Sequence, residues 1–204
     1  ITGTAEAKST VTILDGTTVL GTATAGTDGT YSFTPTTILP DGSHSLTAKA
    51  KDAAGNISNV SATLAVTVDT VAPNKPVLTA VTTPLNSATP TLKGTAEAKS
   101  EVSIYEDQTL VGKAIADSTG AFSATLSTSL VDGSHTLTAK AKDGAGNISA
   151  NASDPLTIQI DTVAPNKPTL SVAGLLSNSF IKTSKPVITG TAEAKSTVTI
   201  LDGT

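Results

Sequence analysis

Residues 1–17 read ITGTAEAKSTVTILDGT, and the same letters return without a change at residues 188–204. A diverged copy, LKGTAEAKSEVSIYEDQ, begins 91 residues after Ile1, at Leu92, and lies 96 residues before Ile188. This spacing is too long for the units of a solenoid and matches complete small β domains in tandem. Because the exact identity skips the middle copy, we expect two alternating repeat types in a longer array.

The composition favours strands with small cores. Of 204 residues none is Cys, Met or Trp, the 13 basic residues are all Lys, and only five residues are Tyr or Phe. The frequent Thr, Val and Ile fit the pleated surface of a strand. A net charge of −4 without Arg argues against nucleic acid, and no apolar run approaches the length of a membrane span. We therefore expect neither nucleic-acid binding nor membrane insertion.

Two proline-containing connectors divide the chain. The segment DTVAPNKP occupies residues 69–76 and recurs at 161–168. Its two prolines fix φ and remove amide donors, so each connector is expected to be extended and semi-rigid. These boundaries predict a repeat at 1–70 that lacks its A strand, a complete repeat at 71–162, and the N-terminal part of a third repeat at 163–204.

Alternating apolar residues predict about seven strands in the complete repeat. The pairs Val102/Ile104 and Leu156/Ile158 have the period of two that half-buried strands show. No stretch keeps a helical period with caps. An all-β fold of tandem immunoglobulin-like sandwiches in an elongated array is therefore the prediction. The expected strands A to G cover 77–83, 89–96, 101–106, 109–116, 121–126, 135–142 and 155–160.

The same acidic residues return in each repeat, and strand direction predicts where they meet. Asp69 ends the G strand of the first repeat, at the end that abuts the B–C and F–G loops of the second repeat. We therefore expect Asp69 near Glu97, Asp143 and Asn147. Converging carboxylates repel unless a cation joins them, and oxygen ligands without His or Cys suit Ca²⁺. The open alternative is turn chemistry, in which the Asp side chain accepts hydrogen bonds from local amides.

His44 and His135 occupy one position in two repeats, shortly after an Asp-Gly turn. Neither has a second His or Cys nearby in its motif. A ring packed at the sandwich end and hydrogen-bonded to a backbone carbonyl is therefore expected, rather than a metal ligand or a catalyst. No GxSxG motif and no recurring Ser/His/Asp order is present, and no glycine-rich phosphate loop precedes a helix. We do not expect an enzyme.

Three motifs in order, GTAEAKSTV, DGSHSLTAKAKDAAGNIS and VDTVAPNKP, resemble the bacterial Ig-like repeats of giant biofilm-associated, type I-secreted (RTX-type) surface adhesins. The resemblance covers essentially the whole chain. It implies a non-catalytic extracellular stalk on the bacterial cell surface, with calcium at the joints between neighbouring repeats. Carried over by position, the ligands are Asp69, Glu97 and Asp143 at the first joint, Asp161 and Glu193 at the second, and Glu6 and Asp52 in the first repeat.

Three functions stay open at this point. The leading one is a structural stalk or spacer, stiffened by calcium, that supports adhesion and biofilm formation. In the second, the repeats themselves mediate self-association or ligand binding for cell–cell cohesion. Tyr31, Phe33 and Phe122 fall in strand patterns and are expected in the core, which favours self-association over sugar binding; one form is strand exchange, with 163–187 of one molecule completing 1–70 of another. The third, an accessory module of a secreted polysaccharide-degrading enzyme, is disfavoured because such modules seldom form alternating, near-identical arrays.

Overall fold

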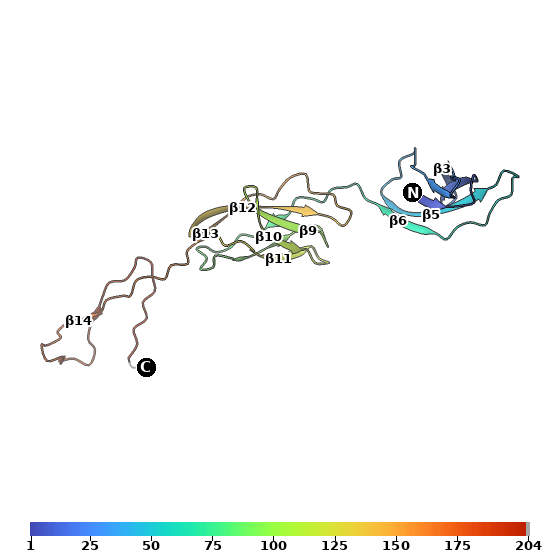
Figure 1. The fold of residues 1–204 in the computed structure, drawn as a ribbon. Helices are drawn as coiled ribbons and strands as arrows, with labels where there is room; N and C mark the ends of the chain where they lie inside the picture. Colours follow the sequence, from blue (N-terminus) through green and yellow to red (C-terminus); the bar gives the residue numbers. More distant parts are fainter. Residues whose placement is uncertain (203–204) are drawn as a thin grey trace.

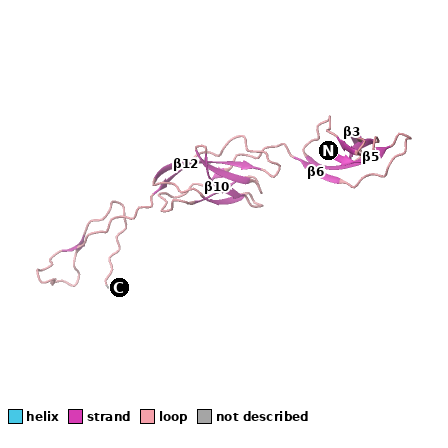
Figure 2. Cartoon of the chain, viewed as in Figure 1, coloured by secondary structure: helices cyan, strands magenta, loops and turns pink. Residues whose placement is uncertain are grey.

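The computed structural model describes residues 1–202, and in that range it contains strands and turns but no helix. No helix long and apolar enough to cross a membrane is therefore found in the described part. Two β-sandwiches follow one another along an extended chain, and a smaller part with a short hairpin follows them (Figures 1 and 2). The predicted all-β class is confirmed. The last two residues of the 188–204 copy and of the predicted third repeat lie outside the described residues.

The second repeat is a sandwich of seven strands in two antiparallel sheets. One sheet has the order β10-β9-β12-β13 and the other β11-β8-β7. The strands are β7 (Val77–Leu78), β8 (Thr91–Thr95), β9 (Glu101–Glu106), β10 (Thr109–Ile115), β11 (Ala121–Thr125), β12 (Gly133–Lys142) and β13 (Leu156–Ile160). Each lies within its predicted range or extends it by two residues, as β12 does. The immunoglobulin-like sandwich is confirmed.

The first strand of this repeat is shorter than the predicted 77–83. Strand β7 covers only Val77–Leu78, and one further bond, from the Thr79 amide to the Lys93 carbonyl, joins this segment to β8. The chain then crosses to the other sheet, where Leu85 forms a parallel bridge with Ile160 of β13. The amide of Leu85 donates to the Gln159 carbonyl at 2.8 Å, and Leu85 in turn accepts from the amide of Asp161 at 2.9 Å. Pro84 has no amide hydrogen to continue a ladder. The segment 77–85 therefore closes one edge of the sandwich by contacting both sheets.

The alternation predicted from the sequence builds the core of the second repeat. Leu92, Ile104 and Leu137 are fully buried between the two sheets. Phe122 is buried as well, and residues of the first segment, Leu78 among them, pack against this cluster. Burying a side chain of this kind stabilises a fold by about 1.5–3 kcal/mol. The segment 77–85 is therefore part of the core.

The first repeat has the same two sheets without a strand equivalent to β7. Its sheets have the orders β3-β2-β5-β6 and β1-β4. Leu64 is 54% exposed and Val66 is half-buried, whereas Ile158, at the position of Val66 in the second repeat, is 1% exposed. Phe33 is buried and Tyr31 half-buried, as predicted for core aromatics. The strands are β1 (Thr2–Thr4), β2 (Thr10–Asp15), β3 (Thr18–Thr24), β4 (Thr30–Ser32), β5 (Gly42–Lys51) and β6 (Leu64–Val68).

The part that follows the second repeat contains one short antiparallel pair. Strand β14 (Ser171–Val172) pairs with β15 (Ile188–Thr189). This pair repeats the β7–β8 contact, since the amide of Thr169 also donates to the Thr191 carbonyl at 2.9 Å. Almost all of its apolar side chains are exposed, including Leu170 at 61%. Among the described residues, this part therefore has a strand pair but no buried core.

Candidate functional site at the joint between repeats

The GTAEAKS motif forms one kind of turn in each part of the chain. In the second repeat Lys99 adopts the left-handed conformation, with φ 66°, and the equivalent Lys8 has φ 63°. The amide and hydroxyl of Ser100 both donate to the Glu97 carbonyl, at 3.1 and 2.7 Å. The Glu97 side chain is exposed and borders, with Asn74, a shallow groove beside the connector. The motif therefore presents its glutamate at the joint.

Asp143 organises the loop between β12 and β13. Its Oδ1 accepts the amides of Gly146 and Asn147 at 2.7 and 2.9 Å, and its Oδ2 accepts from Asn147 Nδ2 at 2.8 Å. Burial acts to raise the pKa of Asp143, but the hydrogen bonds from Asn147 and the loop amides outweigh it and lower that pKa below its ordinary value. Asp143 is therefore held ionised by N–H donors of its own loop.

The side chain of Asn147 connects the two sandwiches. Besides its bond to Asp143, Nδ2 donates to the backbone carbonyl of Asp69 at 3.0 Å. Asp69 directly follows β6, and its own carboxylate accepts the Val71 amide at 3.1 Å. The predicted approach of Asp69 to the loop of the next repeat is therefore present, but it is made by a carbonyl rather than by a carboxylate.

The remainder of the connector lies on the second repeat. Pro73 and Pro76 are buried, although both belong to the link between domains. Lys75 Nζ contacts Asp154 Oδ1 at 2.6 Å in an exposed ion pair. Exposed pairs contribute only about 0–1 kcal/mol, so the buried prolines and the Asn147 contact hold the connector in place.

The structure brings the predicted calcium ligands of this joint together only in part. Asp143, Asn147 and the Asp69 carbonyl meet directly, while Glu97 lies beside the connector. Within residues 1–202, no three acidic or histidine side chains form a group that could hold a metal ion. The Asp143 oxygens face N–H donors, which a cation would have to displace. This donor set is not a preformed Ca²⁺ cage, and calcium at the joint stays a prediction.

The other predicted ligands take part in local turns. Asp52 accepts both the amide and the side-chain Nδ2 of Asn56, each at 2.8 Å, so it repeats the Asp143 loop. In the first repeat, Glu6 accepts the Ser9 hydroxyl through its carbonyl at 2.7 Å. Asp161 also caps a local amide, that of Val163, at 3.2 Å. These contacts are the turn chemistry that the sequence left open as the alternative.

Glu193 repeats the turn of Glu6 and Glu97 in the third part of the chain. Its carbonyl accepts the amide and the hydroxyl of Ser196, at 3.1 and 2.7 Å. The neighbouring Lys195 has φ 67°, the same left-handed conformation as in the other copies. The turn therefore forms even where the described residues contain no sandwich around it.

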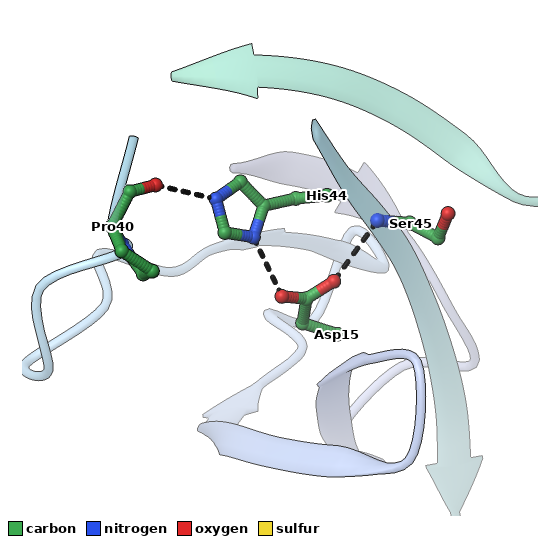
Figure 3. A network of polar contacts seen from close by, with 4 residues as sticks. All are labelled: Asp15, Pro40, His44 and Ser45. Carbon is green, nitrogen blue, oxygen red and sulfur yellow. Dashed lines mark hydrogen bonds and ion pairs between the residues drawn. The ribbon is translucent and has the colours of Figure 1, made fainter. Parts of the chain in front are cut away.

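A second polar site, at the opposite end of each sandwich, was missed by sequence reasoning. His44 hydrogen-bonds through Nε2 to the Pro40 carbonyl at 2.8 Å, which confirms the expected ring–carbonyl contact. Its Nδ1 contacts Asp15 Oδ2 at 2.6 Å (Figure 3). In the second repeat His135 pairs with Glu106 in the same way, and acid and histidine are 29 residues apart in both repeats. That recurring separation is the signal that could have revealed the pair.

Comparison with known proteins places the chain in a family. The model of the bacterial Ig-like domain matches residues 1–70 and 81–162, and the chain belongs to this family. Chitinase A1 of Niallia circulans is 36% identical over 146 residues, which are 69% of this chain and 20% of that protein. Exoglucanase B of Cellulomonas fimi is 32% identical over 179 residues, 80% of this chain and 16% of that protein. The chain thus spans a fifth or less of these relatives.

Two solved structures resemble the chain more weakly. A biofilm associated protein, BSP domain, has a TM-score of 0.35 at 21% identity, covering 80% of this chain and 27% of its own. A protease structure has a TM-score of 0.29 at 18% identity, covering 50% of this chain and 21% of its own. Likenesses of this strength say nothing about function.

Proposed function

We propose that the chain is a non-catalytic spacer, whose Ig-like repeats hold a functional domain at a distance within a larger bacterial protein. The observation that supports this role best is the connector seated on the second repeat, with Pro73 and Pro76 buried and the Asp69 carbonyl bound by Asn147. A connector held along its length has little freedom to bend. Two sandwiches joined in this way behave as one stiff rod rather than as two domains on a flexible linker.

In its finer form, the proposal is a stalk segment of a large extracellular adhesin that supports attachment and biofilm formation. Membership of the bacterial Ig-like family and the ordered motif trio favour this setting. Repetition then supplies reach, because each added repeat lengthens the rod without new chemistry. An extracellular location at the bacterial surface is part of the same proposal.

The spacer role is tested by the distance distribution between the two sandwiches. The chain contains no cysteine, so Thr22→Cys on β3 and Ser123→Cys on β11 provide two unique and exposed labelling sites. Pulsed electron spin resonance of the doubly labelled chain is expected to give one narrow distribution. A broad distribution, of the width that a flexible linker of this length gives, would overturn the proposal.

Calcium stiffening is a separate part of the proposal and concerns Asp69, Glu97 and Asp143. Asp69 and Glu97 are both exposed; the Asp69 carbonyl is bound by Asn147 of the Asp143 loop, and Glu97 borders the connector. Weak oxygen-ligand sites in extracellular modules have dissociation constants of about 10⁻⁴–10⁻³ M. In excess calcium, compared with EGTA, the distance distribution between the two labelled sandwiches should narrow and the melting temperature should rise. Identical results in the two conditions would remove calcium and leave the spacer role intact.

Self-association is the second candidate, and a groove in the first repeat favours it. The groove has a volume of about 430 Å³ and is lined by Ala5, Val11, Ala48, Ala50 and Ile57 among others. In the second repeat, the segment 77–85 contacts the equivalent core. Residues 163–187 of a second copy carry the connector sequence and are proposed to bind there by strand exchange. Light scattering should then show a dimer at high concentration, whereas a monomeric mass throughout would exclude this candidate.

The curated relatives favour a third setting for the same spacer. Both are named as polysaccharide-degrading enzymes, a chitinase and an exoglucanase, and the chain matches only a small part of each. An accessory spacer within such an enzyme would have the same rod-like behaviour. A depletion assay with insoluble chitin and cellulose distinguishes a spacer from a binding module. The spacer should stay in solution, and retention would show a carbohydrate-binding role instead.

A further inference from the structure

Both histidines have hydrogen-bond acceptors on both sides of the ring. His44 Nδ1 lies 2.6 Å from Asp15 Oδ2, and its Nε2 lies 2.8 Å from the Pro40 carbonyl (Figure 3). His135 has the same arrangement, 2.6 Å from Glu106 Oε1 and 2.8 Å from the Val131 carbonyl. A neutral imidazole carries only one N–H, so only the imidazolium can donate to both acceptors. His44 and His135 are 7% and 8% exposed, so both histidines are buried.

The carboxylate position is chemically constant although the residue changes. Asp15 is the last residue of β2 and Glu106 is the last residue of β9. These two strands occupy the same place in their sandwiches, and a shorter and a longer side chain reach the same ring nitrogen at the same distance. The first repeat uses an aspartate and the second a glutamate, yet the contact with the histidine is the same. The two repeats therefore share the ion pair rather than the residue type.

The strand residues paired with the histidines are apolar, and the nearest other carboxylates, Asp41 and Asp132, follow the residues that accept from the rings. His44 lies on β5, and its register partner on β6 is the apolar Val66. His135 on β12 has Ile158 of β13 as its partner. The charged group that acts on each ring is the acid described above, Asp15 in the first repeat and Glu106 in the second.

The loop that receives each histidine also holds the outgoing connector. Asp41 follows Pro40, and its Oδ1 accepts the amide and the hydroxyl of Thr70 at 3.0 and 2.9 Å. Asp132 follows Val131 and binds Thr162 in the same way, at 3.0 and 2.8 Å. The contact with the histidine and the contact with the connector are therefore made by adjacent residues of one loop.

We propose that His44 and His135 are pH-dependent clamps, which hold the connector-bearing loop closed while the ring is doubly protonated and release it when a proton is lost. After deprotonation, one ring nitrogen presents a lone pair to an oxygen lone pair, of the carboxylate or of the carbonyl. That contact becomes repulsive, and the loop loses its anchor to the ring. This clamp does not depend on the spacer role.

The direction of the pH effect follows from the hydrogen bonds. The bond to the carboxylate, and then the bond to the backbone carbonyl, raise the pKa of both histidines above the ordinary value of 6.5. Stabilisation by a group whose pKa is raised in the folded state is complete below its unfolded pKa. It is lost as the pH rises through the folded pKa. The clamps are therefore closed in acid and open on the alkaline side of 6.5.

The test compares the full chain with the double variant Asp15→Asn/Glu106→Gln. A carboxamide donates to Nδ1 of a neutral ring, while Nε2–H still donates to the carbonyl, so the variant keeps the contact without needing the second proton. Asp107→Asn is the matched control, since it removes one carboxylate beside Glu106 at an exposed position that asparagine tolerates, with φ 52°. Each protein is followed by ¹⁵N spectra of the imidazoles and by hydrogen exchange of the Thr70 and Thr162 amides.

In the wild type and in the control, both rings should titrate above 6.5, and protection of the two amides should fall several-fold over the same pH range. The double variant should titrate lower and keep its protection constant. If the wild-type rings titrate at or below 6.5, the proposal is overturned, and this result does not depend on whether the variant folds. Equal loss of protection in the wild type and the double variant would overturn the link to the connector.

Discussion

At the scale of single residues, Asp143 and Asp52 begin the same loop in different surroundings. Both accept the backbone amide and the side-chain amide of the asparagine four residues later. Asp143 is buried against the joint, whereas Asp52 is half-buried on a loop that makes no hydrogen bond to a connector among residues 1–202. The two residues therefore form a matched pair that separates loop formation from the role in the joint.

We predict that Asp143→Asn destabilises the second repeat. The new NH₂ group would face Asn147 Nδ2, a donor facing a donor, where a carboxylate oxygen stood. Losing one hydrogen-bond partner of this kind lowers the melting temperature of a small domain by about 4–8 °C. Calorimetry at neutral pH measures the shift. Asp52→Asn should lower the melting temperature of the first repeat in the same way. Only Asp143→Asn should broaden the distance distribution between the sandwiches. Broadening by Asp52→Asn would contradict a specific role of the Asp143 loop in the joint.

The same carboxylates predict acid sensitivity. The hydrogen bonds that lower the pKa of Asp143 and Asp52 stabilise the fold above the ordinary value of 3.8. This contribution is lost as the pH falls through the lower folded pKa. The wild-type melting temperature should therefore fall steeply below 3.8. Melting curves of the wild type and the two Asn variants check this, and parallel acid profiles in all three would argue against it.

Sequence reasoning found part of the polar sites and missed the rest for a physical reason. Strand direction alone placed Asn147 against Asp69, because successive loops of an antiparallel sandwich alternate between its ends. Whether a carboxylate or a carbonyl makes that contact depends on side-chain rotamers, which no pattern gives. His44 and Asp15 are 29 residues apart in the sequence. They meet because the register between β2 and β5 places Asp15 opposite Leu46, two residues after His44. A periodic pattern predicts strands but not which residues are register partners.

At the scale of the strands, the glycine of GTAEAKS explains how the first strand packs. A Cβ on Gly94 would overlap the carbonyl oxygen of Val77 in β7, and one on Gly190 would overlap the Thr169 carbonyl. At Gly3, in the first repeat, a Cβ would meet the side chain of Tyr31, whose hydroxyl is nearest. The motif glycine is thus required where the backbone that follows a connector lies directly against it, as at Gly94 and Gly190.

We predict that Gly94→Ala displaces β7 from its sheet. Because backbone lies against Gly94, the overlap cannot be relieved by a side-chain rotation, and overpacking of this kind costs about 1–3 kcal/mol. The amide of Thr79, which donates to the Lys93 carbonyl at 2.8 Å, should lose its protection from hydrogen exchange. Gly3→Ala is the control and should cost less, since the Tyr31 ring can move. Equal effects at the two positions would show that the first strand does not press on the motif.

Strand prediction succeeded where alternation was strong and failed where a strand changes sheets. The run Glu101–Glu106 was predicted with its observed bounds, because apolar and polar residues alternate along it and turns flank it. The first strand was predicted to be continuous, but it pairs with β8 over two residues and then with β13. Leu78 at the first pairing and Leu85 at the second both pack, partly buried, against the same core, so the hydrophobic pattern does not show where the segment changes sheets.

At the scale of the whole molecule, identical connector sequences have different burial. Pro73 and Pro76 are buried on the second repeat, while Pro165 and Pro168 are exposed. The sequence therefore predicts a semi-rigid connector, but the domain that receives it decides whether the prolines are buried. Within residues 1–202, only the first connector has a complete sandwich to pack on, so the burial of its prolines reflects contact with that sandwich.

The contact between Asn147 and Asp69 is predicted to set the stiffness of that joint. Asn147→Ala removes two hydrogen bonds, one to Asp143 in its own loop and one to the Asp69 carbonyl across the joint. Asn56→Ala removes the first kind only, since Asn56 Nδ2 donates to Asp52. A difference between the two variants in the distance distribution between the sandwiches is therefore due to the bond from Asn147 to the Asp69 carbonyl.

Such a bond contributes about 0.5–1.5 kcal/mol, which changes the population of a second joint orientation by about two- to tenfold. In the labelled chain, Asn147→Ala should broaden the distance distribution between the sandwiches, and Asn56→Ala should not. Both variants should also lower the stability of their own repeat, because each removes the side-chain bond to the loop aspartate. If Asn147→Ala leaves the distribution as narrow as in the wild type, the Asn147 bond does not set the stiffness of the joint, and the buried prolines and the Asp41–Thr70 bonds hold the connector without it.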